Sequence, residues 1–163
     1  MSARAADYFA VRPDRVAALH EACSSWAGTP FRARSAVKGE FGGVDCASFI
    51  GAAFLDCGAV GLVVSVPPYT INHAEHSEES MFRTWFESPA ARERVRLVDE
   101  DEPHLDGDIV FPVVGRCEHH AGIRIGGDVH HIARPSGYCV PRITQLRLHR
   151  SRYRLLSAPA ISP

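Results

Sequence analysis

The apolar residues of this chain change their spacing near Gly107, from helical steps to the short runs that form strands. Before that point they recur every three or four residues, as at Val16, Leu19 and Cys23, and again over 46–57. After it, short apolar or alternating runs are separated by Gly, Pro and Asp. Helices followed by strands predict an α+β domain, with N-terminal helices packed on a mostly antiparallel sheet of five to six strands.

Capping residues, glycines and prolines predict where the helices and strands begin and end. The expected helices are 13–27, 46–57, 81–86 and a short one from Ser88. Asp45 is a plausible N-cap of the second helix, Gly58 fits its end, and Ser77 is the expected start of the third. The stretch 28–44 is rich in glycine without periodicity, which indicates a loop. The expected strands are 108–114, 121–125, 129–133, 140–144 and 153–158, with a tight hairpin turn at 126–128.

The composition is that of an ordinary globular protein. The chain has 163 residues, of which 45% are hydrophobic and 23% charged, so we expect one domain over residues 1–163. No apolar run approaches the ~18 residues of a transmembrane helix, and the N-terminal residues lack the apolar core of a signal peptide. We therefore expect a protein that is cytoplasmic as synthesised and has no membrane partner. Five cysteines, an odd number at irregular spacing, predict mostly reduced thiols.

Charge is unevenly distributed, although the formal net charge is only −1. Acidic residues gather over 99–108, and none follows Asp128, whereas the C-terminal part is rich in arginine. The arginines concerned are Arg134, Arg142, Arg147, Arg150, Arg152 and Arg154. They fit either a surface that contacts an anionic partner or the solvated face of a strand. No nucleic-acid-binding motif accompanies them, so we expect no nucleic-acid partner.

Cys46 stands at the first turn of a predicted helix, directly after the glycine-rich stretch 28–44. Unpaired backbone N–H groups and the helix dipole favour an anion there, which predicts a stabilised thiolate and a place for an oxyanion. The alternative is a small core residue on the apolar stripe of Phe49 and Ile50.

Three histidines supply the other groups that a cysteine nucleophile requires. His120 opens the strand 121–125, and His130-His131 lie in the strand that follows the hairpin turn. A nucleophilic thiol needs a base within hydrogen-bonding reach, and the base needs an orienting partner on its other ring nitrogen. Side chains alternate across a strand, so only one of His130 and His131 can face His120. We favour His131 and keep His130 as the alternative.

Four short motifs resemble the NlpC-type (NlpC/P-sixty) cysteine peptidases in their order and spacing. They are Trp26 to Phe31, Gly43 to Ile50, Gly107 to Phe111 and His120 to Gly126. Together with His131 they span about two thirds of the chain. The loop from Ala36 to Gly39, with Pro67-Pro68-Tyr69 downstream, resembles the phage-tail and gene-transfer-agent branch of that family.

The resemblance implies a papain-like core that hydrolyses peptide bonds in peptidoglycan stem peptides, often between D-γ-glutamate and a diamino acid, with no metal or organic cofactor. Carried over residue by residue, it makes Cys46 the nucleophile, His120 the general base and His131 the orienting residue. Asp45 and Ser48 would bind substrate, and Asp45 is equally well explained as a helix N-cap. The chain departs from the family pattern at Phe31, where tyrosine is common, and at Ala47-Ser48, where Ser-Gly is usual.

Two other classes of protein fit parts of the sequence. A zinc-binding module would use neighbouring soft and borderline ligands: Cys117, His119, His120, His130, His131 and Cys139. A phage-tail structural protein would keep the fold without turnover. Since no export signal is visible, a wall hydrolase would reach its substrate through a phage-tail or secretion partner, as a virion-associated protein, or after lysis.

Overall fold

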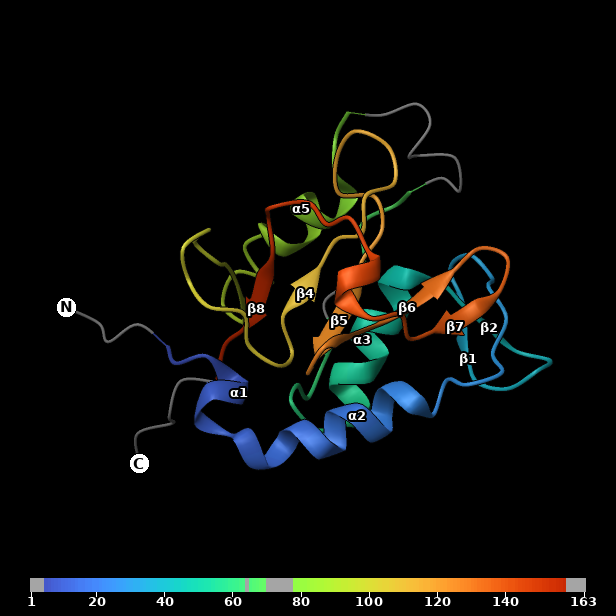
Figure 1. Cartoon of the computed structure of the whole chain (residues 1–163), viewed down its shortest axis with the longest axis horizontal. Helices are drawn as coiled ribbons and strands as arrows, with labels where there is room; N and C mark the ends of the chain where they lie inside the picture. Colours follow the sequence, from blue (N-terminus) through green and yellow to red (C-terminus); the bar gives the residue numbers. More distant parts are fainter. Residues whose placement is uncertain (1–4, 64, 70–77, 158–163) are drawn as a thin grey trace.

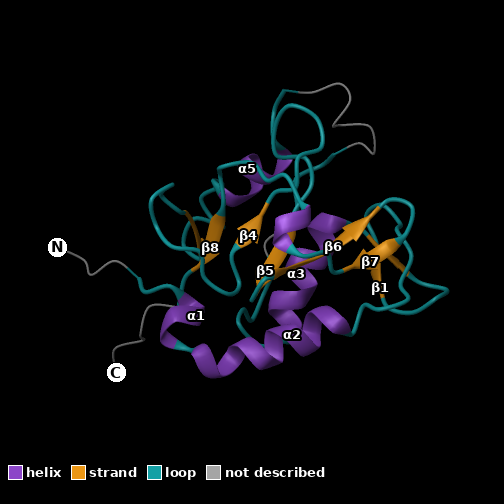
Figure 2. Cartoon of the chain, in the orientation of Figure 1, coloured by secondary structure: helices purple, strands orange, loops and turns teal. Residues whose placement is uncertain are grey.

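Helices and antiparallel sheet make up the computed structural model, which describes residues 5–63, 65–69 and 78–157 (Figures 1 and 2). The helices are α1 (Tyr8–Val11), η1 (Pro13–Arg15), α2 (Val16–Ser24), α3 (Cys46–Asp56), α5 (Met81–Phe86) and η2 (Ile143–Gln145), where η marks a 3-10 turn. A small sheet pairs β1 (Ala36–Val37) with β2 (Gly43–Val44). The main sheet has six strands in the order β3-β8-β4-β5-β6-β7, and every neighbouring pair is antiparallel.

The six strands of the main sheet come from the second half of the chain. They are β3 (Val95–Leu97), β4 (Ile109–Val110), β5 (Gly122–Ile125), β6 (Asp128–Ala133), β7 (Gly137–Cys139) and β8 (Tyr153–Leu155). A two-residue turn joins β5 to β6, since Ile125 pairs with Asp128. The predicted α+β class, the antiparallel pairing and this hairpin are confirmed.

Helix α3 is the element that positions the candidate nucleophile. Asp45 caps it by accepting a hydrogen bond from the Ser48 N–H at 2.8 Å, as the sequence predicts. The helix packs against α2 on one side and against β5 and β6 on the other. Its buried apolar residues, Phe49, Ile50 and Phe54 among them, join the main core. Cys46 therefore begins a helix whose place on the sheet is set by its buried side chains.

Several predicted boundaries are wrong. The helix expected over 13–27 is η1 followed by α2, and the chain turns after Ser25. Ser80, rather than Ser77, caps α5 by accepting from the Arg83 N–H; Ser77 lies outside the described residues. The fourth helix expected from Ser88 is a series of turns.

The strand predictions also need correction. Strand β3 was not predicted, and β1 and β2 form a short hairpin inside the expected loop 28–44. The strand expected over 140–144 is displaced to β7, and η2 begins at Ile143 instead. Pro141 explains part of this shift, because it has no N–H to donate to a sheet ladder.

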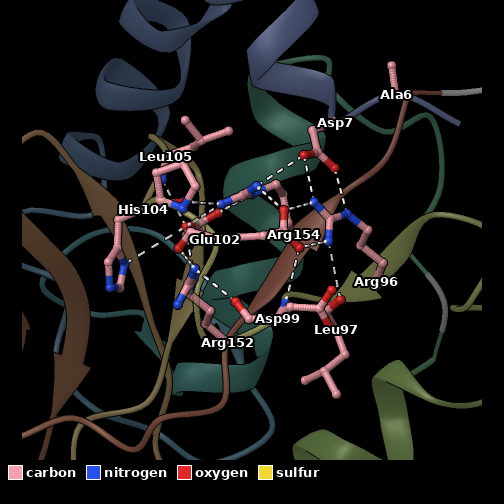
Figure 3. Close-up of polar contacts among 12 residues, drawn as sticks. Ala6, Asp7, Arg96, Leu97, Asp99, Glu102, His104, Leu105, Arg152 and Arg154 are labelled. Carbon is pink, nitrogen blue, oxygen red and sulfur yellow. Dashed lines mark hydrogen bonds and ion pairs between the residues drawn. The ribbon is translucent and has the colours of Figure 1, made fainter.

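A cluster of buried and partly buried ion pairs joins the N-terminal segment to β3, β8 and the acidic stretch 99–108 (Figure 3). Arg96 forms paired hydrogen bonds of 2.7 Å with both Asp7 and Glu102. Arg154 contacts Asp108 at 2.6 and 3.0 Å and Asp7 at 3.0 Å. The side chains of Arg154 and Asp108 are 4% and 0% exposed, so this pair belongs to the interior.

This cluster accounts for part of the uneven charge in the sequence. From the acidic stretch 99–108, Glu102 and Asp108 pair with Arg152 and Arg154 of the C-terminal part, whereas the acidic residues 99–101 are exposed. Arg152 and Arg154 are buried, so they cannot form part of an exposed contact surface. The exposed arginines of the segment are Arg134, Arg142, Arg147 and Arg150.

All five cysteines are free thiols, as their odd number and spacing predict. Within the described ranges, no helix is both long enough and apolar enough to cross a membrane.

Candidate active site

A cavity of about 520 Å³ brings together the residues expected to carry chemistry. Cys46, His120 and His131 line it, and Asp45 and Tyr69 lie in the same wall. The rest of the lining is mainly apolar: Phe31, Ala33, Met81, Pro112, Val113, Val114, Ile132, Ala133 and Leu146, with His119 and Arg134. One cavity therefore holds a thiol, three imidazoles and a broad apolar wall.

Cys46 is the first residue of α3 and is half-buried at the cavity. The Ser48 N–H donates to the Asp45 side chain, which satisfies one of the four unpaired donors of the first turn, and the Phe49 N–H donates to the Asp45 carbonyl oxygen as the first regular bond of the helix. The N–H groups of Cys46 and Ala47 lie close to the sulfur, as does the N–H of Ala121 at the head of β5. Backbone donors thus surround the sulfur, where the negative charge of a thiolate would form.

The two imidazoles contact each other directly. His120 Nε2 lies 2.7 Å from His131 Nδ1, and the two rings meet nearly edge to face. This contact leaves Nδ1 of His120 as the ring nitrogen available to a nearby thiol. The pair has the arrangement of a base with its orienting partner.

Gly122 makes room for this histidine pair. It stands opposite His131 in the β5–β6 register. A Cβ atom at Gly122 would lie 3.0 Å from the Cβ of His131 and 2.7 Å from a methyl carbon of Val129. A side chain here would push β6 away. The close approach of β6 therefore explains why the residue two positions after His120 is a glycine.

Strand alternation separates His130 from His131, as expected. His130 is 2% exposed, and its Nδ1 lies 2.7 Å from the hydroxyl of Tyr138. Its ring also packs edge-on against His20. His131, not His130, is the histidine that reaches His120.

Burial sets the resting charge of the thiol and the base. It raises the pKa of Cys46 to about 12, although the N–H groups of Ala121 and Ala47 act in the opposite direction. Burial, together with the neighbouring His131, lowers the pKa of His120 to about 4. At neutral pH both groups rest uncharged. The expected resting thiolate is therefore corrected: loss of solvent outweighs the backbone donors.

Asp45 is fully engaged by its surroundings. Its carboxylate accepts hydrogen bonds from the N–H of Ser48 at 2.8 Å, from the N–H of Arg34 at 2.5 Å and from the hydroxyl of Tyr69. These contacts confirm the N-cap role and hold Tyr69 against the cavity. Among the described residues that line the cavity, Asp45 is present and Ser48 is not.

Three residues of the site were not singled out as such from the sequence. Tyr69 arrives from the segment after α3, and Arg134 follows β6 with its guanidinium 5.2 Å from the centroid of the Phe31 ring. Cys139 lies in β7 with its sulfur 3.2 Å from His131 Nε2. The sequence named Cys139 only as a candidate zinc ligand, and the strand expected over 140–144 began one residue after it.

The six candidate zinc ligands divide into separate groups. Cys117 Sγ lies 3.0 Å from His119 Nε2, His130 faces away from the cavity, and the remaining three form the row His120, His131, Cys139. In the part of the chain that the structure describes, no three or more His, Cys, Asp or Glu residues are placed to hold one metal ion.

A scan against protein-family models finds no match to this chain, and neither does a search of curated proteins. A thiol, a neutral imidazole with a second imidazole behind it, and converging backbone donors are the groups required for acyl transfer through a thioester.

Proposed function

We propose that this protein is a cysteine-nucleophile hydrolase that cleaves peptide bonds in peptidoglycan stem peptides, of the D-γ-glutamyl-diamino acid type. The observation that carries the proposal is the shared cavity of Cys46, His120 and His131, with His120 Nε2 at 2.7 Å from His131 Nδ1. The motif resemblance supplies the substrate class. The start of α3 at Cys46, the place of His120 just before β5 and that of His131 in β6 also support a papain-like arrangement of the NlpC type.

The proposed reaction has two half-reactions, and its protons balance. The Cys46 sulfur attacks the carbonyl carbon while its proton passes to His120 Nδ1, and the N–H groups of Cys46 and Ala47 stabilise the oxyanion. The C–N bond then breaks, and His120 returns the proton to the leaving amine. Water attacks the resulting thioester with His120 as base, which releases a carboxylic acid and restores the thiol. His131 holds the His120 ring in orientation throughout.

The cavity suits a short peptide that carries a carboxylate. Its apolar wall can cover the aliphatic parts of a stem peptide, and the exposed Arg134 at its rim offers a cation to a substrate carboxylate. Tyr69 places a hydroxyl beside Asp45 in this cavity, which Phe31 also lines without a hydroxyl. Delivery to the wall by a phage-tail or secretion partner belongs to the same proposal.

Digestion of defined muropeptides, followed by mass spectrometry of the products, tests the function. The parent protein should convert the substrate, and Cys46→Ala should abolish conversion. His120→Ala should lower kcat by about 10²–10⁴-fold, the usual contribution of a general base.

A comparison of His131→Ala with His130→Ala then shows which of the two neighbouring histidines orients His120. His131→Ala should be the slower enzyme, with circular dichroism confirming that both variants fold. An inactive parent, or a parent whose activity survives Cys46→Ala, would contradict the proposal.

A further inference from the structure

Three side chains form one row that begins at the cavity lined by Cys46. His120 Nε2 lies 2.7 Å from His131 Nδ1, and His131 Nε2 lies 3.2 Å from the sulfur of Cys139. His131 therefore uses both of its ring nitrogens within the row, and His120 uses one. Cys139 ends the row.

The direction of the hydrogen bonds in this row decides whether His120 can act as a base. To accept a proton at Nδ1, neutral His120 must carry its own proton on Nε2 and donate it to His131 Nδ1. Neutral His131 then carries its proton on Nε2, and that N–H points at Cys139. If Cys139 donated its S–H instead, every proton in the row would shift, and His120 would present an N–H to the thiol.

We propose that Cys139 is a positioning residue that accepts the Nε2–H of His131 and thereby keeps His120 in the tautomer that can take the proton of Cys46. The inference rests on the proposed function for its catalytic meaning, although the tautomer itself is independent of any substrate. Sulfur is a weak acceptor, so the expected effect is modest.

The fold holds Cys139 in place by backbone contacts. His131 and Cys139 are directly paired in the β6–β7 register. Strand β7 begins at Gly137, whose φ is 80° and whose added Cβ would lie 2.2 Å from the Thr29 carbonyl oxygen. The close approach of β7 to the segment before β1 therefore fixes the strand from which the thiol reaches His131.

Two substitutions separate hydrogen bonding from packing. Cys139→Ala removes the acceptor, and Cys139→Asp restores one that cannot donate when ionised. On defined muropeptides, Cys139→Ala should lower kcat by about three- to tenfold, the range of a single modest hydrogen bond, while KM changes less than about twofold. Cys139→Asp should recover kcat to within about twofold of the parent. The control is Cys117→Ala. It removes a thiol that contacts a different histidine, His119, and that lies outside the row.

Nitrogen-15 NMR of the histidine rings supplies the readout that needs no substrate. The parent should show His131 protonated on Nε2, and Cys139→Ala should show a mixture of the Nε2–H and Nδ1–H forms. An Nδ1–H form of His131 in the parent, unchanged kcat in Cys139→Ala, or an equally slow Cys139→Asp would overturn the inference. An inactive parent with the expected tautomers would instead reject the proposed function and leave the row intact.

Discussion

The pH dependence of alkylation at Cys46 gives a direct test of the resting state of the thiol and its base. With the pKa of Cys46 near 12 and that of His120 near 4, both groups are neutral over most of the accessible range. Proton transfer from the thiol to the imidazole neither takes up nor releases a proton. The population of the reactive thiolate–imidazolium form is therefore independent of pH between the two pKa values.

The expected magnitudes differ widely between a paired and an isolated thiol. A lone thiol with a pKa near 12 becomes about tenfold more reactive with each pH unit, because only the thiolate reacts, which is about 1,000-fold between pH 6 and pH 9. If transfer of its proton to His120 supplies most of the thiolate, as the proposed function requires, Cys46 should instead react at nearly the same rate across that interval. Below about pH 5 its reactivity should fall as His120 becomes protonated.

Iodoacetamide labelling, followed by mass spectrometry of the tryptic peptides, measures the rate at each cysteine. The labelling rate at Cys46 should stay nearly constant from pH 6 to pH 9. In His120→Ala the profile at Cys46 should become steep. A tenfold rise per pH unit in the parent would refute the reasoning.

Three further predictions concern stability and geometry. Arg154→Met leaves the carboxylate of Asp108 in the interior and should lower the free energy of unfolding in urea by about 3–5 kcal/mol, whereas exposed Arg150→Met should cost at most about 1 kcal/mol. Hydrogen bonds from Arg96 lower the pKa of Glu102 to about 2, so this residue contributes stability above its unfolded pKa of about 4.5, and that contribution is lost as pH falls toward 2. Unfolding midpoints at pH 7 and pH 3 should accordingly differ less in Glu102→Gln than in the parent. Gly122→Ala should displace β6 and lower kcat/KM on muropeptides by about 10- to 100-fold while the protein remains folded; unchanged kinetics would show that the contact has no role.

Local signals predicted the part of the site that lies on α3. An N-cap signal identified Asp45, and an apolar stripe identified the helix that begins at Cys46. Both signals depend on neighbours within one helical turn. The hairpin of β5 and β6 was predictable for a similar reason, since its turn residues are adjacent to the strands that it joins. This hairpin brought His131 opposite Gly122, beside His120.

Contacts between distant segments were not predictable from such signals. Cys139 lies beside His131 only because β7 begins earlier than its alternating pattern indicates, and a shift of a few residues changes which side chain reaches the cavity. Tyr69 meets Asp45 across a connection that carries no periodicity. The burial that raises the pKa of Cys46 likewise depends on the whole cavity, which no single segment encodes.

The ion-pair cluster also has a consequence for the order of events during synthesis. Asp7 and Arg154 are separated by 147 positions, yet they meet at 3.0 Å, and the neighbouring strand contact joins Asp7 to Leu156. Until Arg152 and Arg154 have emerged from the ribosome, Asp108 of the nascent chain lacks its buried guanidinium partners. We therefore expect nascent chains stalled before Arg154 to be sensitive to protease, and chains extended far enough to expose β8 to become resistant. The helix that bears Cys46 would thus emerge early and gain its final support late, when β8 completes the sheet between β3 and β4.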